Sequence, residues 1–310
     1  MTTVIFNGNG SSTGVPQLFC DCDVCKSSDI HDKRLRCSVY VEAQGNTAKD
    51  LYGHVYPTTN LVIDTGPEFR IQCLKYNVKR LDGVLITHSH ADHCHGLDDL
   101  RIFSFKKPNK KETPGDGLPI YCNSNTLNDL IYRFAYIFKV NNLGGGIPKL
   151  NLLPTDSYSA KKPFSIGTIQ VLPVPMMHGY LESCGFVLRD AAPDGAEHAI
   201  AYLTDCSHIP DLSLESIKAF CGKRGSPEHL IIDGLRKTEH WTHCNFDRAL
   251  FYANQIGAEH TWLTHITHET FHTDIQNYIN AHLAEYTLLN KIVRAGGSVA
   301  PAYDGLQIEV

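Results

Sequence analysis

The chain has 310 residues and a formal net charge of −5, with 42% hydrophobic and 20% charged residues. This balance excludes a disordered chain and a surface built to bind polyanions in general, so any recognition of phosphate has to be local. The 17 His are many for this length, and they favour metal or proton-transfer chemistry.

No stretch of the sequence approaches the roughly 18 to 20 apolar residues of a membrane span. The first residues, Met1–Gly8, lack the basic and apolar regions of a signal peptide. We therefore expect a cytoplasmic protein with no membrane partner. In a reducing compartment the 11 Cys are thiols or metal ligands.

Strand and helix signals alternate along the chain, with no linker between two halves. Strands are expected at residues 3–6, 37–42, 60–64, 81–86, 119–122, 168–174, 185–188, 199–204, 230–232 and 261–264. Helices are expected at residues 68–78, 97–105, 123–137 and 212–220. This alternation predicts an α/β fold with two sheets sandwiched between helices, in a single domain over residues 1–310.

Three segments rich in polar residues or chain breakers interrupt this pattern. We predict loop insertions near residues 45–59, 106–118 and 139–150. The last of them contains the breaker-rich run Gly144–Pro148 and is a candidate lid. Because specificity often lies in such loops, the natural substrate does not follow from the strands and helices alone.

Three imidazoles and one carboxylate fall within six residues just after the strand at 81–86, at His88, His90, Asp92 and His93. A loop that leaves a strand can aim alternate side chains at two different ions. The alternative is a surface loop that is merely rich in His. The spacing and the matching residues elsewhere in the chain favour a metal site.

Three further polar residues lie where predicted strands end. His178 follows one strand, Asp205 another, and His265 a third. Each of them taken singly is more often a structural residue. If the strand ends meet at one sheet edge, however, these residues and the first cluster form a set of ligands for two metal ions.

This ligand order, with Asp64-Thr65-Gly66 upstream, resembles the metallo-β-lactamase-fold hydrolases over nearly the whole chain. The resemblance implies a four-layer αββα sandwich and two divalent metals, Zn²⁺ or Mn²⁺ with Fe²⁺ as a third option, that share a bridging hydroxide. It places His88, His90 and His178 on one metal. It places Asp92, His93 and His265 on the other, with Asp205 bridging both. Asp64 would brace the metal loop by hydrogen bonds.

Cys20, Cys22 and Cys25 place three thiols within six residues, and a tetrahedral zinc would need a fourth ligand. Three unrelated buried thiols are the alternative. In its glycine-led form from Gly14, this loop resembles the PhnP-like phosphodiesterases of the same fold, which implies His268 as the fourth ligand of a structural Zn²⁺. The remaining cysteines are expected to be packing residues or incidental thiols: Cys37, Cys73, Cys94, Cys122, Cys184, Cys206, Cys221 and Cys244.

The same resemblance assigns His243 as an active-site histidine that is not a ligand, although the neighbouring residues from Asn245 to Asp247 depart from the family pattern. His243 would contact a phosphate oxygen or protonate the leaving alkoxide. Alternatively, it caps the helix that begins near Asn245. We predict His243 and Asp92 as the catalytic residues. The remaining candidates, His95, His208, His240 and His272, lack ligand spacing and are expected at the surface or in supporting roles.

The resemblance implies a phosphodiesterase that cleaves a small cyclic phosphate or a nucleotide-like ester. The alternatives on the same scaffold are RNA processing of the tRNase Z type and thioester or lactone hydrolysis. A further alternative is an accessory protein of the PqqB type that binds metal without catalysis. The acidic net charge argues against nucleic acid as a partner. The one basic loop of the chain, Lys106–Lys111, is expected to be a solvated turn. A homodimer is compatible with the sequence.

Overall fold

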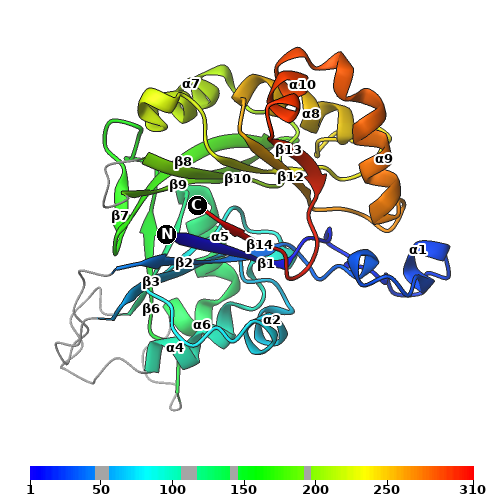
Figure 1. The fold of residues 1–310 in the computed structure, drawn as a ribbon. Coiled ribbons are helices and arrows are strands. Elements are labelled where there is room, and N and C mark those ends of the chain that lie inside the picture. The colour runs from blue at the N-terminus through cyan, green and yellow to red at the C-terminus, as the bar shows by residue number, and fades with distance from the viewer. Residues whose placement is uncertain (46–55, 106–116, 140–145, 192–196) are drawn as a thin grey trace.

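Short runs of β-branched and other apolar residues form most of the strands, and these strands assemble into two seven-stranded sheets. The computed structural model describes residues 1–45, 56–105, 117–139, 146–191 and 197–310. The two sheets pack face to face, and helices cover the outer face of each (Figure 1). This arrangement confirms the predicted α/β fold and the four-layer αββα sandwich.

The first sheet has the strand order β14-β1-β2-β3-β4-β5-β6. Its strands are β1 (Thr2–Gly8), β2 (Ser38–Gln44), β3 (Thr58–Ile63), β4 (Gly83–Leu85), β5 (Leu118–Cys122), β6 (Leu150–Pro154) and β14 (Gln307–Glu309). From β14 to β3 neighbouring strands are antiparallel, and from β3 to β6 they are parallel. The carboxyl ends of β3 and β4 therefore lie at the same edge of the sheet.

The second sheet has the strand order β13-β12-β11-β10-β9-β8-β7. Its strands are β7 (Phe164–Ile166), β8 (Ile169–His178), β9 (Leu181–Ala191), β10 (Glu197–Leu203), β11 (His229–Asp233), β12 (His260–Thr264) and β13 (Ser298–Pro301). From β7 to β10 neighbouring strands are antiparallel, and from β10 to β13 they are parallel. The carboxyl ends of β8, β10, β11 and β12 consequently share one edge.

Most helices lie in two groups, one on each outer face, whereas α1 lies to one side of the sandwich (Figure 1). The helices are α1 (Asp23–Lys26), α2 (Phe69–Lys75), α3 (Ala91–Cys94), α4 (Arg101–Phe105), α5 (Ser124–Arg133), α6 (Ala135–Phe138), α7 (Asp211–Phe220), α8 (Phe246–Ile256), α9 (His272–His282) and α10 (Thr287–Arg294). Short 3-10 helices are η1 (Ile30–Asp32), η2 (Leu97–Leu100), η3 (Gly222–Arg224) and η4 (Leu283–Glu285). No described helix has both the length and the apolar character needed to cross a membrane.

Three apolar clusters hold the layers together. The central cluster lies between the sheets and contains Phe6 and Ile63 from the first sheet with Phe186 and Ile231 from the second. A second cluster joins the second sheet to α7, α8, α9 and α10, and a third joins the first sheet to α2 and α5. Each fully buried side chain of this size contributes about 1.5–3 kcal/mol to folding, so both sheets are fixed from two sides.

The structure differs from the predicted elements at several places, and the helix expected at residues 97–105 is the 3-10 helix η2 followed by α4. The single helix expected at residues 123–137 is wrong, because it divides into α5 and α6 where Phe134 leaves the helical region with φ −107° and ψ 42°. The elements β6, α9, α10, β13 and β14 have no counterpart among the predicted ones. The basic loop Lys106–Lys111 lies outside the described residues. So do parts of the predicted insertions near residues 45–59, 106–118 and 139–150.

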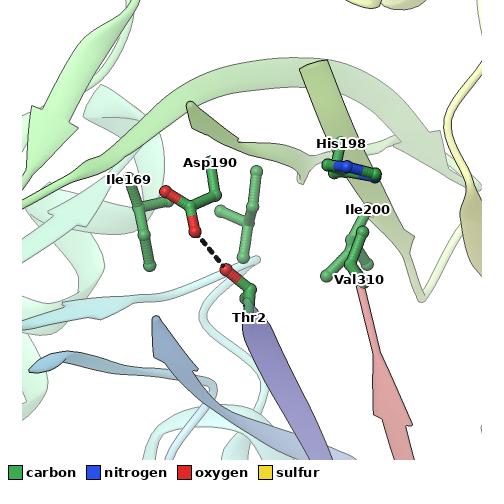
Figure 2. A pocket seen from close by; sticks show the side chains of 7 residues that line it. Thr2, Ile169, Asp190, His198, Ile200 and Val310 are labelled. Atoms are coloured by element: carbon green, nitrogen blue, oxygen red, sulfur yellow. Dashed lines mark hydrogen bonds between the residues drawn. The ribbon is translucent and has the colours of Figure 1, made fainter. Parts of the chain in front are cut away.

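A small pocket lies between the sheets at the strand ends remote from the His-rich loop (Figure 2). The Thr2 hydroxyl at the start of β1 donates to Asp190 Oδ2 at 2.7 Å, and His198 near the start of β10 lines the same pocket. Because Asp205 follows the other end of β10, the full length of a strand separates this pocket from the predicted metal ligands. The hydrogen bond between Thr2 and Asp190 joins the two sheets at this end, away from the predicted metal ligands.

Candidate metal centre

The predicted ligands converge because their strands end at neighbouring edges of the two sheets. His88 lies three residues after β4 ends, His178 is the last residue of β8, and Asp205 lies two residues after β10 ends. His265 directly follows β12. The sequence therefore places polar side chains at the ends of buried apolar strands, and the fold brings those ends together.

The seven predicted ligands of the active site form two groups in which all donor atoms lie within 4.8 Å of one another. One group contains His88, His90 and His178, and the other contains Asp92, His93, Asp205 and His265. These are the sets that the family resemblance implies, with Asp205 counted in the second. His90 is exposed, whereas the other six residues are buried, so the cluster opens to solvent at His90.

Asp205 occupies the centre of the cluster. Its Oδ1 lies 3.3 Å from His265 Nε2, 3.9 Å from His88 Nε2 and 4.0 Å from His178 Nε2. Its Oδ2 lies 3.1 Å from His93 Nε2. A carboxylate that faces imidazoles of both groups has the position that a bridging ligand requires.

Strained backbone marks three residues at this site. Asp64, Asp205 and His265 adopt φ of 63°, 54° and 59°, in the left-handed region that L-residues other than glycine enter only at a cost of about 1–2 kcal/mol. In each case the chain turns sharply just after a strand, and the turn aims the side chain at the cluster. Such strain persists only where the surrounding structure enforces it, and the packed strands do so here.

Hydrogen bonds fix the imidazole rings. Asp64 accepts from the backbone N–H and the hydroxyl of Thr87 at 2.9 to 3.1 Å, and its Oδ2 lies 2.7 Å from His93 Nδ1. His88 Nδ1 lies 3.0 Å from the Thr87 hydroxyl, and His178 Nδ1 lies 2.7 Å from the carbonyl oxygen of Thr242. These bonds confirm the predicted bracing role of Asp64 and leave Nε2 of each ring facing the cluster.

The buried donors of this cluster lack partners of their own. Among the described residues, the Nε2 atoms of His88, His93 and His265 have no hydrogen-bond partner although they are buried. Burial alone would lower the pKa of His93, but the carboxylates of Asp205, Asp92 and Asp64 outweigh it and raise that pKa well above its usual value. The cluster thus has unsatisfied donor atoms and a surplus of negative charge, and both features fit divalent cations.

His243 lies between the two groups of donors. Its ring stacks on His265 at 4.7 Å and meets His178 edge-on at 4.4 Å, and its donor atom also comes within 4.8 Å of those of His178 and Asp205. Its Nδ1 lies 2.8 Å from Asp233 Oδ2. Burial opposes protonation, but the charge and the hydrogen bond of Asp233 raise the pKa of His243 to about 9. The pairing with Asp233 therefore favours the protonated form of His243.

Asp233 is a residue that the sequence analysis did not assign to the site. It ends β11, and its Oδ2 also accepts from the backbone N–H of Cys206 at 3.1 Å. Its position at a strand end, like that of Asp205, is the signal that could have found it. The alternative that His243 caps the following helix is wrong, because the side chain of Asn245 accepts from the backbone N–H of Arg248 and caps α8.

The second predicted cluster also comes together. The donor atoms of Cys20, Cys22, Cys25 and His268 all lie within 4.8 Å of one another. His268 Nδ1 lies 3.3 Å from Cys20 Sγ and 3.4 Å from Cys22 Sγ. Ligand bonds of about 2.3 Å to sulfur and about 2.0 Å to nitrogen in a tetrahedron give a sulfur–nitrogen separation of about 3.5 Å. The observed spacing fits a tetrahedral zinc site.

The thiols of this cluster differ in their electrostatics. The hydrogen bond from His268 lowers the pKa of Cys22 to about 6, whereas burial raises the pKa of Cys25 to about 11. A bound Zn²⁺ would deprotonate all three thiols, because thiolates are its ligands. The remaining cysteines match the expectation of packing residues, since all but the half-buried Cys73 are buried.

A buried arginine ties the cysteine loop to the segment that carries His268. Arg34 is 1% exposed, and its guanidinium donates to the carbonyl oxygens of Thr267 at 2.6 Å and Thr270 at 3.1 Å. Asp32 lies 3.4 Å from the same guanidinium and accepts from the backbone N–H of His272 at 2.7 Å. This pair was not predicted from the sequence, because an arginine in a loop is ordinarily exposed.

His95, His208 and His240 lie outside both groups of donor atoms. His240 lies 5.2 Å from His243 between ring centroids, and its Nδ1 is 3.0 Å from the Thr242 hydroxyl. His208 contacts the Tyr252 hydroxyl at 3.2 Å, and the ring of His95 meets Phe134 edge-on. These contacts agree with the expected surface or supporting roles.

Comparisons with known proteins identify the family. The model of the beta-lactamase superfamily domain matches residues 59–266. A diphosphatase of the PhnP family, of known structure, is 32% identical with a TM-score of 0.74, and the match covers 100% of this chain and 98% of that one. The short form of human tRNase Z is 19% identical with a TM-score of 0.61 and covers 99% of each chain, which shows the shared fold.

An octanoyltransferase of Porphyromonas gingivalis is 32% identical over 265 residues, which are 85% of this chain. The match covers 46% of that protein, so this chain spans about half the length of the curated relative. With the superfamily model matching residues 59–266 and the PhnP-family diphosphatase matching nearly end to end, the chain belongs to the beta-lactamase superfamily and, within it, to the PhnP-like proteins.

Proposed function

We propose that the protein is a metal-dependent hydrolase of small phosphate esters, most specifically a phosphodiesterase acting on a cyclic phosphate or a nucleotide-like ester. The observation that carries this proposal is the pairing of His243 with Asp233 at the edge of a seven-donor cluster. The cluster fits divalent cations, and the paired histidine supplies the proton that a leaving alkoxide needs. The likeness of the chain to a PhnP-family diphosphatase supports hydrolysis at phosphorus.

We propose the ligand sets as follows. His88, His90 and His178 would hold one cation, and Asp92, His93 and His265 a second, with Asp205 between them. Cys20, Cys22, Cys25 and His268 would hold a structural Zn²⁺. The imidazoles of the active-site set suit Zn²⁺, and its carboxylates also suit Mn²⁺ or Fe²⁺. When bound, the two active-site cations would polarise the phosphoryl oxygens and lower the pKa of water.

The residues of the chain then have separate tasks. Asp64 and Thr87 orient the rings of His88 and His93, so that the donors are in place before substrate arrives. The Nδ1–H of His243 donates to Asp233, so that Nε2 is the atom that gives a proton to the leaving oxygen. Such general acid catalysis contributes about 10²- to 10⁴-fold. Asp92 acts in this scheme as a ligand whose carboxylate helps to set the charge of the site.

The direct test is hydrolysis of bis-p-nitrophenyl phosphate and a panel of ribose cyclic phosphates by metal-loaded protein. The wild-type protein should turn over at least one of these substrates, and His90→Ala should lose this activity while remaining folded. His90 is the appropriate target because it is exposed and its removal leaves no cavity in the core. Equal activity of wild type and His90→Ala, or none in either, would contradict the proposal.

Thioester hydrolysis is the second candidate, because one curated relative is an octanoyltransferase. More than half of that relative lies outside the match, so the named activity need not belong to the part that resembles this chain. Hydrolysis of an octanoyl thioester in the absence of any phosphodiester hydrolysis would favour this candidate.

The accessory-protein alternative differs in metal content. Elemental analysis of purified protein should find three metals per chain if both clusters are filled, one of which is Zn²⁺. A single zinc that is lost in a Cys22→Ser variant would instead fit a protein that binds metal only for its structure.

A further inference from the structure

Two large aromatic side chains are exposed beside the His/Asp cluster. Tyr180 is 92% exposed and Trp241 is 65% exposed. Their ring centroids lie 5.5 Å apart at an interplanar angle of 62°. Neither ring contributes to the core, so burial does not account for their presence at this position.

The chain places this pair at the rim of the site. Tyr180 lies two residues after His178 in the turn between β8 and β9, and Trp241 lies two residues before His243. The bond between His178 Nδ1 and the Thr242 carbonyl joins the two segments at 2.7 Å. Since two residues of chain span at most about 7 Å, the Cα atoms of Tyr180 and Trp241 lie within about 7 Å of those of His178 and His243, respectively.

A glycine lets the tryptophan ring lie against the turn. Gly179 has φ +64°, and a Cβ at this position would lie 2.9 Å from the ring of Trp241 and 2.9 Å from the side chain of Thr242. Its backbone N–H donates to the Ser207 hydroxyl at 3.0 Å, which anchors the turn. The ring of Trp241 therefore packs against the turn that carries Tyr180.

The polarity of the surroundings restricts what such rings can bind. The imidazoles and carboxylates of the adjacent cluster are suited to cations, and bound cations would attract a phosphate group. The two aromatic rings at the rim have flat apolar faces. A ligand that combines a phosphate with a flat ring a short distance away satisfies both. Nucleotides have this construction, and any base can stack on an aromatic side chain because each has a π-face.

We infer that Tyr180 and Trp241 form a stacking platform for the base of the substrate, so that the substrate is a nucleoside phosphodiester or diphosphate and not a bare sugar phosphate. The inference rests on the proposed function, because the phosphate would occupy the His/Asp cluster. An acyl chain on the same rings is the competing occupant, and the experiments below separate the two.

Binding can be measured without turnover. The chain has two tryptophans, and Trp262 lies half-buried with its Nε1 donating to His229 at 3.1 Å, so a Trp262→Phe protein leaves Trp241 as the emitter. Adenosine 5′-monophosphate should quench this emission, whereas ribose 5-phosphate should not. Unchanged emission with the nucleotide, or quenching by octanoate in its place, would overturn the inference.

Kinetics with matched substrates provide the second test. Trp241→Ala should lower kcat/KM for the methyl ester of adenosine 5′-diphosphate roughly tenfold or more, and Tyr180→Ala by a smaller factor. The same ester of ribose 5-diphosphate, which lacks the base, should be hydrolysed equally by wild type and variants. Phe251→Ala, which removes a half-exposed aromatic ring from the middle of α8, is the matched control and should change neither rate.

The two failures can be told apart. If neither ester is hydrolysed but the nucleotide still quenches Trp241, the proposed hydrolase function is wrong and the platform stands. If both esters are hydrolysed at the same rate and Trp241→Ala affects them equally, the hydrolase function stands and the platform is wrong.

Discussion

The two candidate metal clusters are built in opposite ways. The His/Asp donors lie at the ends of strands that are packed on both faces, and hydrogen bonds to Asp64 and Thr87 orient the rings of His93 and His88. The Cys donors come from one loop whose apolar support is a small cluster of Val15, Val24 and Cys25 packed near Phe271. The first cluster is organised by the packed sheets, whereas the second depends on a small apolar cluster and on the buried Arg34 and Asp32 that join its loop to the His268 segment.

This difference predicts different consequences of losing a metal. The strand-end cluster should keep its shape, because its side chains are fixed by burial and by hydrogen bonds that no cation supplies. The loop cluster should lose its shape, because binding free energy of a structural zinc is also folding free energy of its loop. Variants of each cluster test this difference.

The largest effect should come from Asp205. Asp205→Asn keeps the size of the side chain but removes the charge that faces both groups of donors. We expect a loss of phosphodiesterase activity of about 10³-fold, as for the removal of a group on which the charge balance of a site depends. The measurements are turnover of bis-p-nitrophenyl phosphate and metal content by elemental analysis. Asp190→Asn, in the remote pocket, is the control and should keep activity and metal content.

Circular dichroism and a melting curve show whether the Asp205→Asn variant is folded. The prediction is that the variant is folded and inactive. If Asp205→Asn unfolded the sheets, the fold of the strands would depend on the charge of Asp205. The claim that the strands alone organise this site would then be wrong.

The second effect concerns the proton given to the leaving group. Asp233→Asn removes the charge that holds His243 protonated, and we expect activity to fall by about 10²-fold for a substrate with an alkoxide leaving group. A p-nitrophenolate leaving group needs less help, so the loss should be much smaller there. The ratio of the two losses is the measurement. Equal losses with both leaving groups would mean that the pair positions substrate and does not donate a proton.

The strand-end ligands could be predicted from the sequence because each follows an apolar run, so spacing alone places His178, Asp205 and His265 at strand ends. Asp233 escaped notice although it occupies the same kind of position, since it lies outside the ligand pattern of the family. Burial of Arg34 could not be predicted, because it depends on carbonyl groups more than 230 residues away in sequence. The fold was predictable at most of the strands, whereas α9 and α10 were missed although Ile275, Ile279 and Leu289 mark their buried faces.

The loop cluster should respond locally. Cys22→Ser removes one thiolate, and we expect one Zn²⁺ fewer per chain together with faster amide exchange in residues 12–30. The strands should exchange as in the wild type, because their core does not include this loop. Mass-spectrometric exchange on both proteins is the measurement, and Cys73→Ser, at a thiol far from His268 in the chain, is the matched control. Faster exchange throughout both sheets would show that the zinc loop supports the whole fold.

The smallest effect links the loop to pH. Burial, reinforced by the charges of His31 and Arg34, lowers the pKa of His272 to about 4, whereas an unfolded chain has an ordinary histidine pKa near 6.5. The folded state therefore binds fewer protons between these values, so stability from the neutral ring is complete above about pH 6.5 and is lost as the pH falls toward 4. Since the ring is only half-buried, solvent reduces this loss to about 1 kcal/mol between pH 7 and pH 5.

His272→Gln removes the titrating group and leaves the backbone N–H that donates to Asp32. Urea unfolding of both proteins at pH 7 and pH 5 should show that the variant loses about 1 kcal/mol less on acidification than the wild type. Metal release at low pH affects both proteins and cancels in this difference. An equal loss in both would place the acid sensitivity elsewhere. A smaller loss in the variant would place it at the imidazole of His272, beside the buried Arg34 and Asp32 that join the loop cluster to the body of the protein.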